Sequence, residues 1–214
     1  MFAVTAIPVL TVAFISVAAT GWILATSTKG PWIVSLIVGS VTGFATYFLA
    51  LAFGFLLSFF GLGIGVADAF LEECLKAPAT KVTHRFCNPA GVTAAFGSAE
   101  VVGKYYFIFL LASPQKAILI DNHMIYLVCG ISGAFLMHLA TGIFYSRIGL
   151  YRGFVASVVV HSLYNLVGLH FDKFANTLDG ILLFVIATVL IVAALGSKQF
   201  FFGSRQQHAL DSPG

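Results

Sequence analysis

Two adjacent carboxylates and a lysine stand close together in one stretch of the chain. They are Glu72, Glu73 and Lys76. If this stretch is helical, Glu72 and Lys76 share a face, so the lysine can neutralise a carboxylate. The two glutamates then point about 100° apart, and one can act as a general base on water while the other orients or charges it. A salt bridge near the end of a helix is the alternative interpretation of this spacing.

A histidine and an asparagine form a second pattern. His161 and Asn165 are four residues apart and therefore fall on one face of a helix. Imidazole can donate or accept a hydrogen bond or bind a metal, and a carboxamide donates two hydrogen bonds. Together they can stabilise a developing oxyanion. A polar contact that holds two helices together is the other interpretation.

Two further ionisable residues lie in apolar surroundings between these patterns. Glu100 follows Gly97 and Ser98, small residues that allow neighbouring helices to pack closely. Lys104 is four residues further on and could be its ion-pair partner. His138 has no charged neighbour on its own predicted helix, so it is either a structural histidine or part of a site.

These carboxylates, histidines and the amide form the inventory of a hydrolytic site. A carboxylate can activate water, and histidine with asparagine can polarise the carbonyl group under attack. Cys74 adjoins Glu73, but a thiol in surroundings of low dielectric is a poor nucleophile. Ser162 adjoins His161 yet points elsewhere on the helix. Direct attack by water is therefore expected, with either Glu72 or Glu73 as the base.

The composition predicts that lipid surrounds the chain. Of its 214 residues, 59% are hydrophobic and 9% are charged, whereas soluble domains carry about 25% charged residues. The net charge of +3 is small and dispersed, which argues against nucleic-acid binding. Ionisable residues inside membrane helices are costly and usually functional. Here they concentrate in the third to sixth of the predicted helices.

Apolar runs separated by polar, glycine and proline breaks predict an all-α fold, a polytopic bundle of about seven transmembrane helices. We expect a single transmembrane domain over residues 1–202, a catalytic core over about 62–170, and a short polar tail over 203–214. Pro78 is expected to end the third helix, and 81–89 and 146–152 to form connections. The glycines at 39 and 43 have a spacing that allows close helix packing. The predicted helices cover about residues 3–25, 31–60, 64–77, 90–112, 123–145, 153–170 and 178–195, with Asp121 and Asn122 capping the fifth.

Seven spans divide the basic residues unequally between the two sides of the membrane. Lys116 and Lys173 fall on one side and eight basic residues on the other. The positive-inside rule then predicts that the N-terminus lies outside and the C-terminus in the cytoplasm. The eight are Lys29, Lys76, Lys81, Arg85, Arg147, Arg152, Lys198 and Arg205.

The order of the motifs resembles the PrsW-type glutamic membrane peptidases, which are relatives of the CAAX prenyl proteases. The family pattern is EExxK, a motif with phenylalanine four residues before glutamate, a lone histidine, and HxxxN. This chain carries these motifs in order over about residues 65–170. The matching residues are Glu72, Glu73 and Lys76, then Phe96 and Glu100, then His138, then His161 and Asn165.

The resemblance implies proteolysis in a bacterial or archaeal cell membrane, with membrane-protein or peptide substrates such as anti-sigma factors. It assigns water activation to Glu72, the oxyanion hole to His161 and Asn165, and the orientation of the base to Glu73 and Lys76. The CAAX enzymes carry His in place of the second-motif glutamate and Arg in place of the lysine. This departure argues against a prenylated protein as the substrate.

Three questions stay open at this point. Glu72, Glu100, His138 and His161 could together bind a divalent ion such as zinc, or they could share protons without a metal. Buried glutamate and histidine also make proton relays, so a proton-coupled transporter is a rival, and a non-catalytic scaffold that binds partner helices is another. Lys76 near a helix end suggests a cavity that opens toward the cytoplasm. The hydrolytic interpretation requires His161 and Asn165 to lie within about 10 Å of Glu72.

Overall fold

In the parts that the computed structural model describes, which are residues 2–26, 31–59, 66–111, 124–171 and 177–210, the chain is helical apart from short connections, and these parts contain no strand. The all-α prediction is therefore confirmed, and seven helices cover these ranges, close to the predicted segments. They are α1 (Phe2–Thr26), α2 (Trp32–Phe59), α3 (Val66–Thr83), α4 (Pro89–Leu111), α6 (Met124–Ile148), α7 (Leu150–Phe171) and α8 (Thr177–Leu210).

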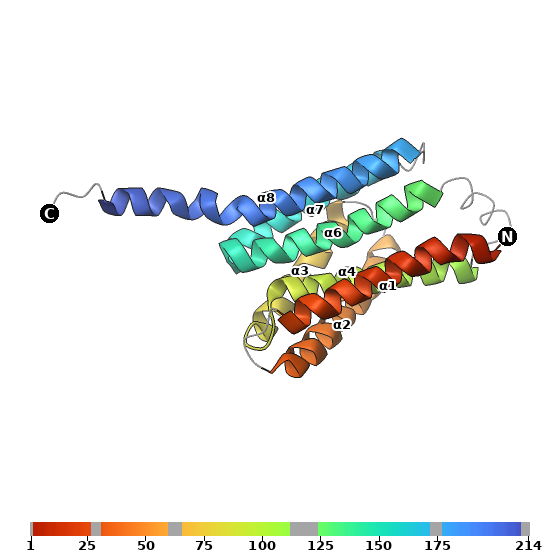
Figure 1. The fold of residues 1–214 in the computed structure, drawn as a ribbon, viewed down its shortest axis with the longest axis horizontal. Helices are drawn as coiled ribbons and strands as arrows, with labels where there is room; N and C mark the ends of the chain where they lie inside the picture. Colours follow the sequence, from red (N-terminus) through yellow and green to blue (C-terminus); the bar gives the residue numbers. More distant parts are fainter. Residues whose placement is uncertain (1, 27–30, 60–65, 112–123, 172–176, 211–214) are drawn as a thin grey trace.

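The helices form one elongated bundle (Figure 1). At its centre α4 packs against α6. Helices α1 and α2 pack against α4, while α7 and α8 pack against α6. Helix α3 contacts α2 and α7 and closes the bundle on the remaining side. The four helices α3, α4, α6 and α7 therefore surround a common interior.

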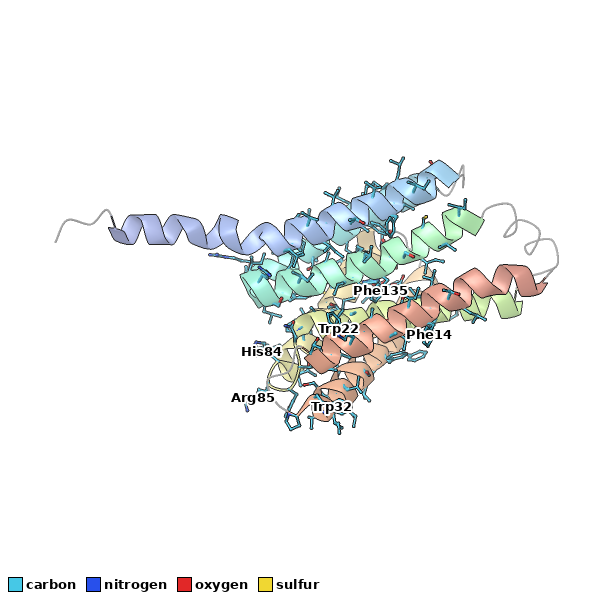
Figure 2. The ribbon with its side chains drawn as sticks, viewed as in Figure 1. Phe14, Trp22, Trp32, His84, Arg85 and Phe135 are labelled. Carbon is cyan, nitrogen blue, oxygen red and sulfur yellow. The ribbon has the colours of Figure 1, made fainter. Side chains whose placement is uncertain are left out.

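Several connections gather at one end of the bundle. The side chain of Ser35, near the start of α2, donates a hydrogen bond to the backbone oxygen of Phe86, between α3 and α4. Trp32, His84 and Arg85 lie together at this end (Figure 2). The turn from α6 to α7 lies here too, because it lines a pocket together with residues of the α3–α4 connection. We call this the basic end; its described basic residues are Lys81, Arg85, Arg147 and Arg152.

The outside of the bundle is apolar. Phe14 and Trp22 are 74% and 70% exposed on α1 (Figure 2). Within the described residues, three helical segments are long and apolar enough to cross a membrane: Trp32–Leu57, Val128–Ile148 and Asp179–Gly196. Apolar residues outside and charged residues inside are the arrangement that suits lipid as the solvent.

Three helix boundaries differ from the prediction. Helix α3 continues through Pro78 to Thr83. A proline inside a helix lacks the backbone donor for the carbonyl group four residues earlier, which is that of Cys74 here, so the helix continues at the cost of one hydrogen bond. The connection after α6 shrinks to Gly149, whose φ of 85° allows the abrupt turn. Helix α8 runs on to Leu210 and so extends into the predicted tail.

The start of α4 and the packing of α2 follow their local sequence. Asn88 caps α4, since its Oδ1 accepts a hydrogen bond from the Ala90 amide at 2.9 Å. The predicted cap at Asp121 and Asn122 lies outside the described residues. The small-residue prediction for α2 is confirmed, because a methyl group at Gly43 would lie 2.6 Å from the backbone oxygen of Val92. Helix α2 thus packs tightly against the part of α4 that carries Phe96.

Candidate active site

The ionisable residues singled out in the sequence converge in the interior of the bundle. Glu73 and Lys76 of α3 are completely buried, and His138 of α6 and His161 of α7 are 1% and 2% exposed. Glu100 of α4 is also buried. We call these five residues, together with Glu72, the ionic network.

Lys76 lies at the centre of the ionic network. Its Nζ is 3.2 Å from Oε2 of Glu72 and 2.9 Å from Oε1 of Glu73, both on its own helix. It is also 2.8 Å from Nδ1 of His138. An ammonium group has three hydrogens, and each of them has an acceptor here. The ring of Phe96, with its centre 4.1 Å from Nζ, adds a cation–π contact.

The contacts of His138 determine its tautomer. Its Nδ1 accepts a hydrogen bond from Lys76, which can only donate. The proton of the neutral ring is therefore on Nε2, which donates to Oε2 of Glu100. Gly97 lets α4 approach this ring, since a methyl group there would lie 2.9 Å from Cβ of His138. Both ring nitrogens of His138 are thus occupied.

Glu73 receives three hydrogen bonds. Lys76 and Nδ1 of His161 each lie 2.9 Å from its Oε1. The hydroxyl of Tyr145 on α6 donates to its Oε2 at 2.7 Å. An ionised carboxylate accepts all three. Since the ionised Glu73 has no proton to donate, Nδ1 of His161 carries the proton of this hydrogen bond. The carboxylate thus orients the ring through Nδ1, on the side opposite Nε2.

Glu72 is the most accessible member of the ionic network. Its side chain is 18% exposed, whereas that of Glu73 is completely buried. Nε2 of His161 lies 3.7 Å from Oε2 of Glu72, too far for a direct hydrogen bond. The rings of His138 and His161 are nearly perpendicular, with centres 5.1 Å apart. Oε2 of Glu72 and Nε2 of His161 therefore border the same small space.

The structure brings Glu72, Glu73, Lys76, Glu100, His138 and His161 together in a single connected set of contacts. The distance limit set for Glu72 and His161 is met. Asn165 follows His161 by one helical turn on α7 and is half-buried. The predicted ion pair of Glu100 with Lys104 involves a side chain outside the described residues.

One prediction about Lys76 is wrong. It was expected near the cytoplasmic end of its helix, but it is fully buried and α3 continues to Thr83 beyond it. A lysine with three buried acceptors has more to gain in the interior than at the membrane surface. Lys76 is therefore a residue of the site and does not count toward the charge at the basic end.

Tyr145 is the site residue that the sequence analysis missed. It lies seven residues after His138, which is two turns of α6 and hence the same face. That spacing is the signal that could have identified it, since a buried tyrosine hydroxyl needs a partner.

The position of Lys76 makes it difficult for a metal ion to bind among the residues of the ionic network. Glu72, His138 and His161 each offer a ligand atom, all within 4.8 Å of one another. The Lys76 ammonium, however, takes Nδ1 of His138 and an oxygen of Glu72. A cation bound by all three residues would have to displace this ammonium group and would be repelled by it. The donor set therefore fits zinc only if Lys76 moves away.

Compared with known proteins, the chain matches no protein-family model, no curated protein and no solved structure.

Proposed function

We propose that the protein is a membrane-embedded endopeptidase that hydrolyses peptide bonds of membrane-protein substrates with water activated by Glu72. The observation that carries the proposal is the asymmetry of the two glutamates. Glu72 is 18% exposed and lies 3.7 Å from a histidine nitrogen. Glu73 is completely buried and holds that histidine from the other side.

The contacts of the two glutamates favour Glu72 as the base. A general base needs a free lone pair within reach of the proton it removes. The oxygens of Glu73 already accept hydrogen bonds from Lys76, His161 and Tyr145. Glu72 accepts a hydrogen bond from Lys76 at 3.2 Å on one oxygen, and its side chain is 18% exposed, which would allow water to reach it. Glu73 therefore acts as a positioning residue.

His161 is held as the histidine of a catalytic triad is held. Its Nδ1–H donates to Glu73, which fixes the ring and leaves Nε2 on the side of Glu72. A neutral Nε2 can accept a proton, and a protonated one can donate a hydrogen bond to an oxyanion. Asn165, one turn along α7, would supply a second donor.

The reaction then proceeds in two steps. The oxygen of water attacks the carbonyl carbon of the scissile peptide bond while Glu72 takes the proton that water loses, which gives a tetrahedral oxyanion facing His161. The bond from carbon to nitrogen then breaks, and the proton is returned to the leaving amine. The products are a carboxylic acid and an amine, and no other reactant is needed.

A metal-free reaction is favoured over a zinc-dependent one. A zinc ion would activate water by lowering the pKa of that water, but the ligand atoms for it are those that Lys76 occupies. The ammonium group supplies a fixed positive charge at this place without a metal.

The likeness of the motifs to the PrsW-type glutamic peptidases supports the same activity and suggests a substrate of the anti-sigma-factor type. For orientation, we propose a bacterial or archaeal cell membrane with the basic end in the cytoplasm. Helix α1 runs toward that end and α8 runs back to it and beyond (Figure 1). The N-terminus would then lie outside and the C-terminus inside.

The proposal is tested by comparing the purified wild type with Glu72→Gln in a cleavage assay with a membrane-protein substrate, together with elemental analysis. Asp68→Asn, one turn earlier on α3, is the matched control because it also replaces a carboxylate with an amide. Glu72→Gln is expected to lower kcat by about 100-fold or more, whereas Asp68→Asn keeps its activity. Unchanged activity in Glu72→Gln would refute the role of Glu72. Stoichiometric zinc that is lost in the variant would replace the metal-free scheme with a metallopeptidase.

A proton-coupled transporter is the second candidate, because the ionic network joins three carboxylates and two histidines that can exchange protons. Proton flux into liposomes that contain the purified protein would favour this function, provided that no substrate is cleaved.

A further inference from the structure

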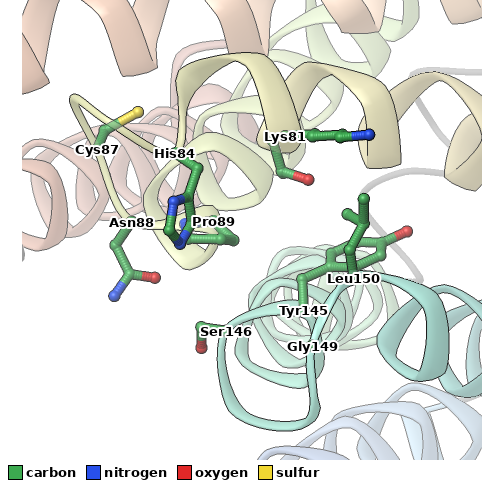
Figure 3. Close-up of a pocket in the computed structure, with 10 residues that line it drawn as sticks. Lys81, His84, Cys87, Asn88, Pro89, Tyr145, Ser146, Gly149 and Leu150 are labelled. Carbon is green, nitrogen blue, oxygen red and sulfur yellow. The ribbon is translucent and has the colours of Figure 1, made fainter.

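A pocket of about 420 Å³ opens at the basic end of the bundle. Its size lies in the range of sites that bind small ligands or a few side chains. Residues of the α3–α4 connection, among them His84 and Asn88, face residues of the α6–α7 turn, among them Ser146 and Leu150, across this pocket (Figure 3). Two separate parts of the chain thus form its walls.

The lining of the pocket suits a negatively charged ligand. Lys81 and His84 are exposed on it, and Asn88 and Ser146 add hydrogen-bonding groups. None of its ten lining residues, all within the described ranges, is acidic. Burial raises the pKa of the Cys87 thiol, which keeps that lining group uncharged as well.

The pocket is joined to the ionic network by one side chain. Tyr145 lines the pocket, and its hydroxyl donates to Oε2 of Glu73 at 2.7 Å. Glu73 in turn holds His161. A chain segment seated against Tyr145 is therefore connected to His161 through two residues, Tyr145 and Glu73.

We propose that this pocket binds an acidic segment of the substrate, the part of its chain that leaves the membrane at the basic end. The inference rests on the proposed peptidase function and adds a substrate preference to it. The contact of Tyr145 with Glu73 favours a substrate over a lipid headgroup, because it places the pocket beside the residue that positions His161. The carboxylates of the segment would pair with Lys81 at the mouth of the pocket.

Binding is tested with two synthetic peptides, each a fluorescent apolar membrane span followed by four residues. The acidic peptide ends in Asp-Glu-Asp-Glu and its matched control in Asn-Gln-Asn-Gln. Both are titrated onto Glu72→Gln protein in phosphatidylcholine nanodiscs, so that cleavage does not interfere. The acidic peptide is expected to bind about fivefold more tightly, as for one partly exposed ion pair.

Variants of the basic residues identify the pocket as the source of this preference. Lys81→Gln should abolish the difference between the two peptides, and Lys81→Glu should reverse it. Arg147→Gln is the control, because Arg147 lies at the same end but binds the Leu195 backbone oxygen and does not line the pocket. An equal loss in Arg147→Gln would mean that the general charge of this end attracts the peptide, and this would overturn the proposal.

Two further outcomes are decisive. Equal binding of both peptides by the protein would overturn the proposal. Thermal stabilisation of the protein by phosphatidylglycerol nanodiscs in the absence of peptide would also overturn the proposal if it depended on Lys81. The pocket would then hold a lipid headgroup. Failure of the peptidase function is distinguishable: the wild type would cleave neither peptide, while the Lys81-dependent preference in binding would remain and support the pocket as the acidic site.

Discussion

Replacing Lys76 with methionine tests whether the ionic network is held together by one buried ammonium group. Methionine has a similar length and keeps the apolar part of the side chain, but it removes all three donors. Glu73 would lose its contact at 2.9 Å and His138 its contact at 2.8 Å. A completely buried carboxylate would then depend on His161 and Tyr145 alone.

The expected loss is about 3–5 kcal/mol of unfolding free energy. This is the range for removing one partner of a buried ion pair, since the charge that remains is left uncompensated. Adding the three lost hydrogen bonds at about 1.5–3 kcal/mol each would give more, but that sum overcounts. Glu72 is 18% exposed and would recover water. For a chain of this size, the smaller figure corresponds to a fall of roughly 10 °C in Tm.

The measurement is thermal unfolding in detergent, with Lys81→Met as the control. Lys81 is on the same helix but exposed, so its replacement should change the stability by at most about 0.5 kcal/mol. The double variant Lys76→Met/Glu73→Gln removes the stranded charge and should be more stable than the sum of the single changes predicts, by about 1–3 kcal/mol. If Lys76→Met melts like Lys81→Met, the central role of the ammonium group is refuted.

Two other substitutions test the surroundings of the ionic network. Gly97→Ala should destabilise the protein by about 1–3 kcal/mol and lower its activity, because the added methyl would lie 2.9 Å from Cβ of His138. The control is Gly130→Ala on α6, which should be neutral because the methyl meets nothing within 4 Å. Equal Tm values for the two variants would contradict the close packing at Gly97. Tyr145→Phe should cost about 1.5–3 kcal/mol in stability, because Glu73 loses a hydrogen-bond donor. It should also lower kcat with little change in KM, because the ring that lines the pocket remains. A change in KM alone would show that the hydroxyl contributes to the pocket and not to the orientation of Glu73.

The sequence was sufficient for the helices and for the six residues of the ionic network, but it missed Tyr145. Uncharged apolar runs and their breaks place the helix centres correctly, because hydrophobicity in lipid leaves few alternatives. The residues of the ionic network could be identified because ionisable groups in apolar helices are rare. The pairing of Glu72 with Lys76 follows from helix geometry alone and is present at 3.2 Å.

The contacts between helices were beyond the reach of the sequence. Lys76 meets His138 across 62 residues of chain, and this contact depends on the packing of α4 and α7, which both contact α3 and α6. For the same reason a lysine that looks like a surface charge is fully buried. Pro78 inside α3 is a similar case, because the helix continues through it to Thr83 although proline by itself favours a helix end.

The small net stability gained by burying the ionic network helps to choose between an enzyme and a non-catalytic scaffold. Burying an ion pair contributes little net stability, and apolar residues of similar volume often serve as well or better. A protein that only had to hold its helices together would gain nothing from burying Glu73, Lys76 and His138 in contact with one another. The two glutamates, moreover, differ in accessibility although they are adjacent, since the side chain of Glu72 is 18% exposed and that of Glu73 is completely buried. One accessible carboxylate beside an oriented histidine is what water activation requires, so the proposed hydrolysis would account for this asymmetry, which a role in helix packing alone would not require.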